Sequence, residues 1–143
     1  MSIRDRRKIY LENAGWLLEH RERAIKEKKW VEAYLLTFFR IELAIHLMID
    51  HKMTMGKVEY SNEFLGKILY TRLGFAELIN LFCAMYGDKL FHALDTIRKE
   101  RNDFVHNFFK RPKRNFIEYV KDLCLGALLV DSALGEVIQE EVG

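Results

Sequence analysis

The chain has 143 residues, of which 50% are apolar and 31% are charged, and its formal net charge is +2. A chain of this length buries roughly two thirds of the surface that its unfolded form exposes, and this composition excludes a disordered segment. The net charge is too small to indicate nucleic acid by itself. A single proline, Pro112, and scattered glycines favour long helices over strands separated by turns. We therefore expect one all-α domain over residues 1–143.

Two long helices are expected first. The first runs from about residue 3 to 26 and carries apolar side chains spaced by three and four along one side. These are Tyr10, Ala14, Leu17 and Ala24. The second, from about residue 29 to 51, is apolar nearly all round, which is typical of a helix surrounded by others. We expect it at the centre of the domain.

Two short helices are expected next. Residues 51–60 form a connector around Gly56, and a short helix then runs from about residue 61 to 72. Gly74 separates it from a second short helix, Phe75 to Tyr86. Short helices are therefore expected between the second long helix and the fourth, which covers residues 88–109.

A long helix over residues 88–109 and a closing helix after Pro112 complete the pattern. The closing helix has an unbroken series of apolar residues at alternating steps of four and three. These are Phe116, Val120, Leu123, Ala127, Val130, Leu134 and Val137. This series predicts a packing seam.

One cation and one carboxylate occupy positions at which the helix periodicity predicts apolar residues. In the helix over 88–109, Arg101 interrupts a series of apolar residues spaced by three and four. In the second helix, Glu42 interrupts a similar apolar series. Burying an unpaired guanidinium costs several kcal/mol, so Arg101 lies at a gap, meets an anion or faces a wet cleft. Glu42 is the candidate partner, and an ion pair of Glu42 with Arg101 or with Arg98 that only fixes helix register is the purely structural alternative.

Asn102 and His106 complete a polar trio with Arg101. Residues four apart lie about 40° from each other around a helix, and the long Arg101 side chain flanks them. A cation, an amide and an imidazole are the groups that a phosphodiester needs. The trio therefore predicts a site for a phosphodiester.

Positive charge gathers around this trio. Between residues 98 and 114 there are seven positive charges and only two negative ones, Glu100 and Asp103. The positive residues are Arg98, Lys99, Arg101, Lys110, Arg111, Lys113 and Arg114. This is a local basic patch, and its last four cations, Lys110, Arg111, Lys113 and Arg114, would hold the phosphates that flank a bound phosphodiester and make its binding salt-dependent.

The run LDTIRKERNDFVHN resembles the reactive motif of the HEPN superfamily, in which an Arg is followed by a polar residue and, five positions after the Arg, by a His. Here these are Arg101, Asn102 and His106. The late position on a long helix, the basic turn and the closing helix also fit, so the resemblance in organisation covers nearly the whole chain. It implies an up-and-down bundle of about five helices.

The resemblance also implies a function. Members of this superfamily are typically homodimers that cut RNA in a shared cleft without metal or other cofactor, leaving 2′,3′-cyclic phosphate and 5′ hydroxyl ends. His106 would move the protons, Arg101 would stabilise the charged phosphorane, and Asn102 would orient the phosphate or the imidazole. Asp103 would steady the imidazole or remain a solvated carboxylate. An endoribonuclease of a toxin or defence system is the function expected.

One position departs from the family pattern. In the branch whose toxins are modified by a nucleotidyltransferase antitoxin, a Tyr usually stands two residues after the His, where this chain has Phe108. Any antitoxin or regulatory protein would therefore act differently. The alternatives are a nonenzymatic dimeric regulator or nucleotide- or RNA-binding adaptor of the same fold, and an unrelated helical bundle.

Other residues suggest sites that we do not favour. Glu42, His46 and His51 follow one another at four and five positions, but a polar core pair explains them better than a metal site. Four aromatics of the second helix have the spacing of core residues rather than of a base-stacking surface. These are Trp30, Tyr34, Phe38 and Phe39.

The cysteines and the apolar segments bear on the compartment. Cys83 and Cys124 lack companions at metal-site spacing and are expected to be reduced core residues. The first fifteen residues are too charged for the apolar core of a secretion signal, and no run approaches the ~18 apolar residues of a membrane span. We expect a cytoplasmic protein without a membrane partner.

Overall fold

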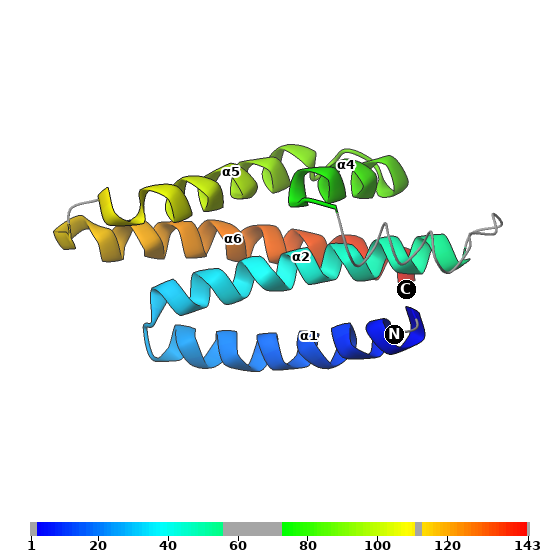
Figure 1. The fold of residues 1–143 in the computed structure, drawn as a ribbon, viewed down its shortest axis with the longest axis horizontal. Helices are drawn as coiled ribbons and strands as arrows, with labels where there is room; N and C mark the ends of the chain where they lie inside the picture. The colour runs from blue at the N-terminus through cyan, green and yellow to red at the C-terminus, as the bar shows by residue number, and fades with distance from the viewer. Residues whose placement is uncertain (1–2, 56–72, 111–112, 143) are drawn as a thin grey trace.

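A computed structural model describes residues 3–55, 73–110 and 113–142, and this part of the chain is helical with no strand (Figure 1). The all-α prediction is therefore confirmed. The helices are α1 (Ile3–Lys26), α2 (Trp30–Met55), α4 (Phe75–Tyr86), α5 (Phe91–Asn107), a short 3-10 helix (Phe108–Lys110) and α6 (Lys113–Val142).

The helix ends differ from the predictions at two places. α2 continues to Met55, so the first residues of the expected connector are helical. α5 begins at Phe91 rather than at residue 88, because a turn precedes it in which the Phe91 amide donates to the Asp88 carbonyl at 3.0 Å. The short helix expected over 61–72 and the turn at Pro112 lie outside the described residues.

Gly87 ends α4 as predicted. Its φ of 95° lies in the left-handed region that favours glycine, and its amide donates to the Cys83 carbonyl at 2.8 Å. The chain can therefore turn sharply from α4 into the segment that starts α5.

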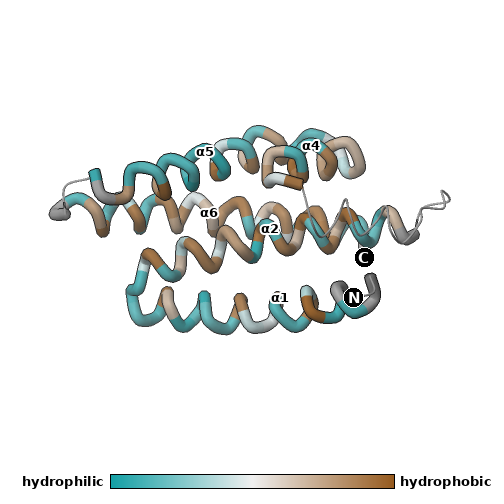
Figure 2. The backbone as a smooth tube through the Cα atoms, viewed as in Figure 1, coloured by the Kyte–Doolittle hydropathy of each residue, from teal (hydrophilic) through white to brown (hydrophobic). Residues whose placement is uncertain are grey.

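The centre of the bundle is α2, as predicted. It packs against α1, α4 and α6, while α5 packs against α4 and α6. Figure 2 shows apolar residues concentrated in α2 and along α6, whereas α1 and α5 are largely hydrophilic. The largest fully buried side chains of α2 are Tyr34, Phe38, Ile41, Ile45 and Ile49.

The predicted apolar stripes form the core. In α6, Phe116 and Val137 pack against the core at either end of a buried series: Val120, Leu123, Ala127, Val130 and Leu134. In α5 the buried residues are Leu90 just before the helix, Leu94, Ile97 and Phe104. Arg101 is thus the charged member of an otherwise apolar stripe.

A polar cluster joins the outer helix α1 to the rest of the bundle. Arg21, only 7% exposed, donates through Nη1 to Asp131 of α6 and through Nη2 to Glu22. Nε of Arg40 on α2 donates to the same Asp131 oxygen at 3.2 Å. Three helices therefore meet at one carboxylate.

Both cysteines are free thiols. Cys124 is buried and Cys83 is half-buried, and burial raises the pKa of both thiols. This agrees with the prediction of reduced core residues.

Candidate functional site

Arg101 reaches from α5 toward α2. The side chain is half-buried, and its guanidinium carbon lies 4.8 Å from the centroid of the Phe38 ring. Its Nε is buried and finds no hydrogen-bond partner within the part of the chain that the structure describes. A cation–π contact thus holds the guanidinium without satisfying that donor.

Glu42 lies one helical turn after Phe38 on α2. Burial raises the pKa of its carboxyl, and the positive charge of Arg101 opposes that rise. Among the described residues, Glu42 and Arg101 form no ion pair within 4.0 Å. Arg98 instead donates to Asp95 at 2.8 and 3.1 Å. Of the two predicted partners, Arg101 is therefore the one whose charge acts on Glu42, across a longer gap than an ion pair.

The residues of the motif face two directions, Arg101 one and Asn102 with His106 the other. Asn102 is half-buried and His106 is exposed. At 3.6 residues per turn, Asn102 and His106 lie about 40° apart around α5, but Arg101 and His106 lie about 140° apart. Since the guanidinium contacts Phe38, one chain brings Asn102 and His106 to the same flank and does not bring the imidazole beside the guanidinium.

Asp103 faces α6. Its carboxylate accepts hydrogen bonds from Nδ2 of Asn107 at 2.6 Å and from the Tyr119 hydroxyl at 3.1 Å. Tyr119 belongs to α6, so Asp103 ties the end of α5 to α6.

The basic patch is weaker than the count over 98–114 suggested. Asp95, just before that window, binds Arg98 and also Lys99, whose Nζ lies 3.0 Å from Asp95. The hydrogen bond from Arg98 is the main reason that the pKa of Asp95 is lowered. Lys110 is exposed. Arg111 and the side chains of Lys113 and Arg114 lie outside what the structure describes.

A groove runs between α1 and α2 beside Glu42. One hollow of about 250 Å³ is lined by Tyr10, Asn13, Leu17, Phe39, Glu42, Leu43 and His46. A second of about 430 Å³ shares Phe39 and is lined also by Trp16, His20, Arg23, Ala24, Glu27, Lys29, Glu32, Leu35 and Leu36. We call these two hollows the α1–α2 groove.

Phe39 corrects a prediction. It was expected in the core with Tyr34 and Phe38, and those two are buried, but Phe39 is 48% exposed. The reason is that Phe39 projects into the α1–α2 groove instead of toward α4 and α6. Trp16, for which the sequence pattern predicts no role, lines the same groove and is 52% exposed.

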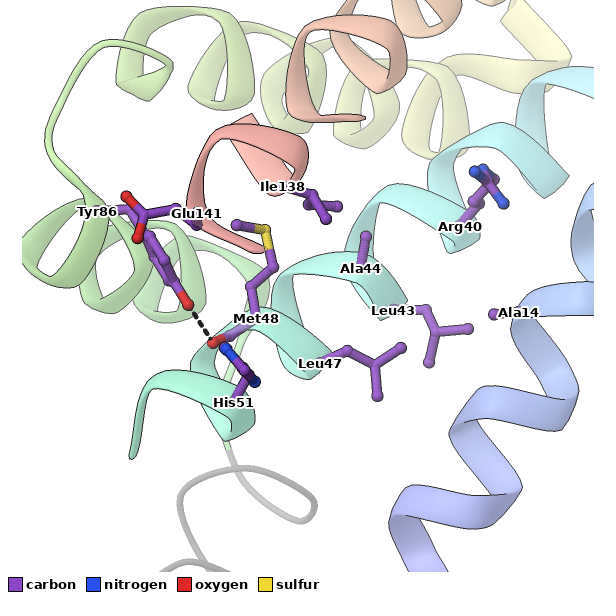
Figure 3. A pocket seen from close by; sticks show the side chains of 10 residues that line it. All are labelled: Ala14, Arg40, Leu43, Ala44, Leu47, Met48, His51, Tyr86, Ile138 and Glu141. Atoms are coloured by element: carbon purple, nitrogen blue, oxygen red, sulfur yellow. Dashed lines mark hydrogen bonds between the residues drawn. The ribbon is translucent and has the colours of Figure 1, made fainter. Parts of the chain in front are cut away.

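A separate cavity of about 320 Å³ is lined by residues of α1, α2, α4 and α6 (Figure 3). Its walls are mainly apolar, and the Tyr86 hydroxyl donates to the Met48 carbonyl at 2.7 Å. Arg40, at one end, is already bound to Asp131. This cavity contains none of the predicted site residues.

Residues 3–55, 73–110 and 113–142 contain neither a metal-binding cluster nor a candidate membrane span. No group of three or more His, Cys, Asp or Glu side chains there is arranged to hold a metal ion. No helix in these ranges combines the length and the apolar character needed to cross a bilayer. His46, considered as a metal ligand above, packs edge-on against Tyr10 with ring centroids 5.6 Å apart.

Comparisons with protein-family models, with curated proteins and with solved structures each return no match. The resemblance to the HEPN motif therefore depends on the residues of α5 and on the order of the helices. Function has to be argued from the geometry of the site.

Proposed function

We propose that this protein is a dimeric, metal-independent endoribonuclease that cuts RNA to 2′,3′-cyclic phosphate and 5′ hydroxyl ends, with Arg101, Asn102 and His106 at the site. One observation carries the proposal. Arg101 is a half-buried cation that no carboxylate of the described residues binds. A guanidinium in this condition stabilises a fold little, whereas phosphate oxygens satisfy its donors well.

The arrangement of the trio supports a dimer. Because Arg101 and His106 lie about 140° apart around α5, their side chains are best brought to one phosphate by two copies of the helix. A twofold axis beside α5 places the imidazole of each copy opposite the other copy's guanidinium. Val105, adjoining His106, is an exposed apolar residue on this flank and suits such an interface.

In this scheme each group has one task. His106 takes the proton of the 2′ hydroxyl, whose oxygen forms a bond to phosphorus while the bond to the 5′ oxygen breaks. The imidazole of the second copy protonates that leaving oxygen. Arg101 stabilises the charge on the phosphorane, and Asn102 orients the phosphate. Lys110, Arg111, Lys113 and Arg114 would hold neighbouring phosphates.

A toxin or defence role fits such an enzyme, with an antitoxin or regulatory protein as partner. Phe108 is relevant to that partner. Its ring packs edge-on against Phe104 and Phe116, with centroids 5.5 and 5.0 Å apart. A residue that packs in this way and has no hydroxyl is not a nucleotide acceptor, so the partner would neutralise the enzyme by binding.

The test compares wild type with Arg101→Ala and His106→Ala on total RNA in the presence of EDTA. We expect wild type to leave cyclic-phosphate ends, and each variant to cut at least ~100-fold more slowly, the loss typical of removing one transition-state donor or proton-transfer group. Lys89→Ala, which removes an exposed cation before α5, is the matched control and should cut normally. Full activity of Arg101→Ala, or loss of wild-type activity in EDTA, contradicts the proposal.

The second candidate is a nonenzymatic dimeric regulator or nucleotide- or RNA-binding adaptor of the same fold. The observation that favours it is the outward position of His106, away from Arg101 in the single chain. It predicts that RNA stays intact, that binding weakens in Arg101→Ala, and that His106→Ala binds as well as wild type.

A further inference from the structure

Two half-exposed aromatic side chains line the larger hollow of the α1–α2 groove. Trp16 comes from α1 and Phe39 from α2, and the apolar residues Ala24, Leu35 and Leu36 line the same hollow. Its volume of about 430 Å³ falls within the roughly 300–1,000 Å³ of small-ligand sites. The hollow thus has the size and the lining for a flat, largely apolar ring.

The indole of Trp16 is held in place. The imidazole of His20 stacks on it with centroids 3.9 Å apart and an interplanar angle of 24°, and Nδ1 of His20 donates to the Trp16 carbonyl at 2.9 Å. The imidazole, which also lines the hollow, covers one face of the indole, and Trp16 is still 52% exposed. An aromatic platform that is already oriented loses little freedom when a ring stacks on it.

The charged residues of the hollow balance one another. Arg23 pairs with Glu19 at 3.7 Å and Lys29 with Glu27 at 3.0 Å. Glu32 is exposed and, within the described ranges, forms no salt bridge. Balanced charges suit a neutral ring better than a phosphate, and the Glu32 carboxylate can accept hydrogen bonds from an amino group on that ring.

We propose that this hollow binds a nucleobase of the RNA, stacked on Trp16 and Phe39, with a preference for bases that carry an exocyclic amino group. This inference rests on the proposed function for its choice of RNA. Aromatic side chains that offer a free face are the common means of holding unpaired bases.

Phe39 links the hollow, along α2, to the residues around Arg101. Phe39 follows Phe38, the residue on which the Arg101 guanidinium lies, and Phe39 also lines the smaller hollow that contains Glu42. A base held at Phe39 would therefore belong to a nucleotide near the phosphate at Arg101. The α1–α2 turn and the end of α5 also lie at the same end of the molecule (Figure 1).

The experiment uses tryptophan fluorescence. The chain has two tryptophans, so a Trp30→Phe background leaves Trp16 as the reporter. This protein is titrated with adenosine, cytidine and uridine monophosphates and with ribose 5-phosphate. We expect the adenosine and cytidine nucleotides to quench Trp16 at lower concentration than the uridine nucleotide, and ribose 5-phosphate to leave the emission unchanged. Quenching by ribose 5-phosphate equal to that by the nucleotides overturns the base site.

Substitutions at Phe39 separate stacking from apolar contact. Phe39→Leu keeps an apolar side chain without a π face and should weaken nucleotide binding about tenfold, whereas Phe39→Tyr should bind as the parent does. Leu129→Ala removes an apolar side chain that is 74% exposed on α6 and should have no effect. Unchanged affinity in Phe39→Leu, with its fold verified by thermal unfolding, overturns the inference.

Cleavage and sedimentation distinguish this inference from the proposed function. Phe39-dependent nucleotide binding in a protein that cuts no RNA upholds the base site and contradicts the ribonuclease. Cleavage that needs Arg101 but is unchanged in Phe39→Leu upholds the ribonuclease and contradicts the base site. If Phe39→Leu converts a dimer to a monomer without changing nucleotide affinity, the groove is an interface between copies and the base site is overturned.

Discussion

Arg21 and Arg101 are two cations in the apolar stripes of two helices, and their guanidinium groups have different partners. Nη1 of Arg21 bonds to Asp131, and its Nη2 bonds to Glu22. Arg101 lies over the Phe38 ring, and the carboxylate that its charge reaches, Glu42, lies beyond ion-pair range. In both residues Nε is buried without a hydrogen-bond partner among the described residues, so the difference is in the terminal nitrogens.

This difference distinguishes a structural cation from an available one. Arg21 and Arg40 share Asp131 and so connect α1, α2 and α6. Arg101 gains a cation–π contact, which is worth about 0.5–2 kcal/mol depending on its desolvation. Both terminal nitrogens of Arg21 are bound to carboxylates, whereas those of Arg101 are left to donate to a ligand. The comparison can be tested by removing each partner in turn.

The largest effect on stability is expected from Asp131→Ala. It leaves the buried Arg21 without its main acceptor and also releases Arg40, and breaking a buried ion pair costs about 3–5 kcal/mol. In a domain of this size we expect Tm to fall by on the order of 10 °C in thermal unfolding. Asp122→Ala, at an exposed position of the same helix, should change Tm little. A drop as small as that of the control would show that the cluster does not join the three helices.

The two arginines themselves should respond in opposite ways to methionine, which keeps an apolar stem of similar length. Arg21→Met leaves Asp131 with Arg40 alone and should cost about 1–3 kcal/mol. Arg101→Met should leave stability within about 1 kcal/mol of wild type or raise it, because a binding residue is often not optimal for stability. Both are read from urea unfolding at neutral pH. Equal losses would mean that Arg101 is as structural as Arg21.

The sequence pattern that revealed Arg101 was also present around Arg21. The stripe Tyr10, Ala14, Leu17 and Ala24 advances by four and three and then by seven, and the skipped position is residue 21. A cation in an apolar stripe can thus be recognised from spacing alone. Its partner cannot, because Asp131 lies on a different helix, 110 positions further along the chain. Periodicity identifies the unusual residue, and tertiary packing decides whether it is satisfied.

The same limit explains the other differences between sequence and structure. The positions of the described helices and the α6 seam follow from local periodicity, so they were predicted well. Phe39 has the spacing of a core residue, but whether that face of α2 is covered depends on where α1 lies. Asp95, which binds Arg98 and Lys99, was missed because the charge count began three residues after it.

The smallest expected effect on stability is that of replacing Glu42. It tests whether this carboxylate is a structural partner of Arg101. Burial raises the pKa of the Glu42 carboxyl despite Arg101, so the folded state binds this proton more readily than the unfolded state. The contribution of Glu42 to stability is therefore largest below the ordinary glutamate pKa of about 4.3 and is lost as pH rises through the folded pKa.

Glu42→Gln should consequently be more stable than wild type at pH 7, with a gain in Tm below about 4 °C, the shift that about 1 kcal/mol gives in a domain of this size. The difference should shrink as pH falls below the ordinary glutamate pKa of about 4.3, because wild-type Glu42 is then increasingly protonated. Glu32→Gln, at an exposed position of α2, should show no such pH dependence. If Glu42→Gln is instead less stable at pH 7, attraction to Arg101 outweighs burial; Arg101 then has a structural partner like Arg21, and the case for a phosphate at Arg101 loses its main support.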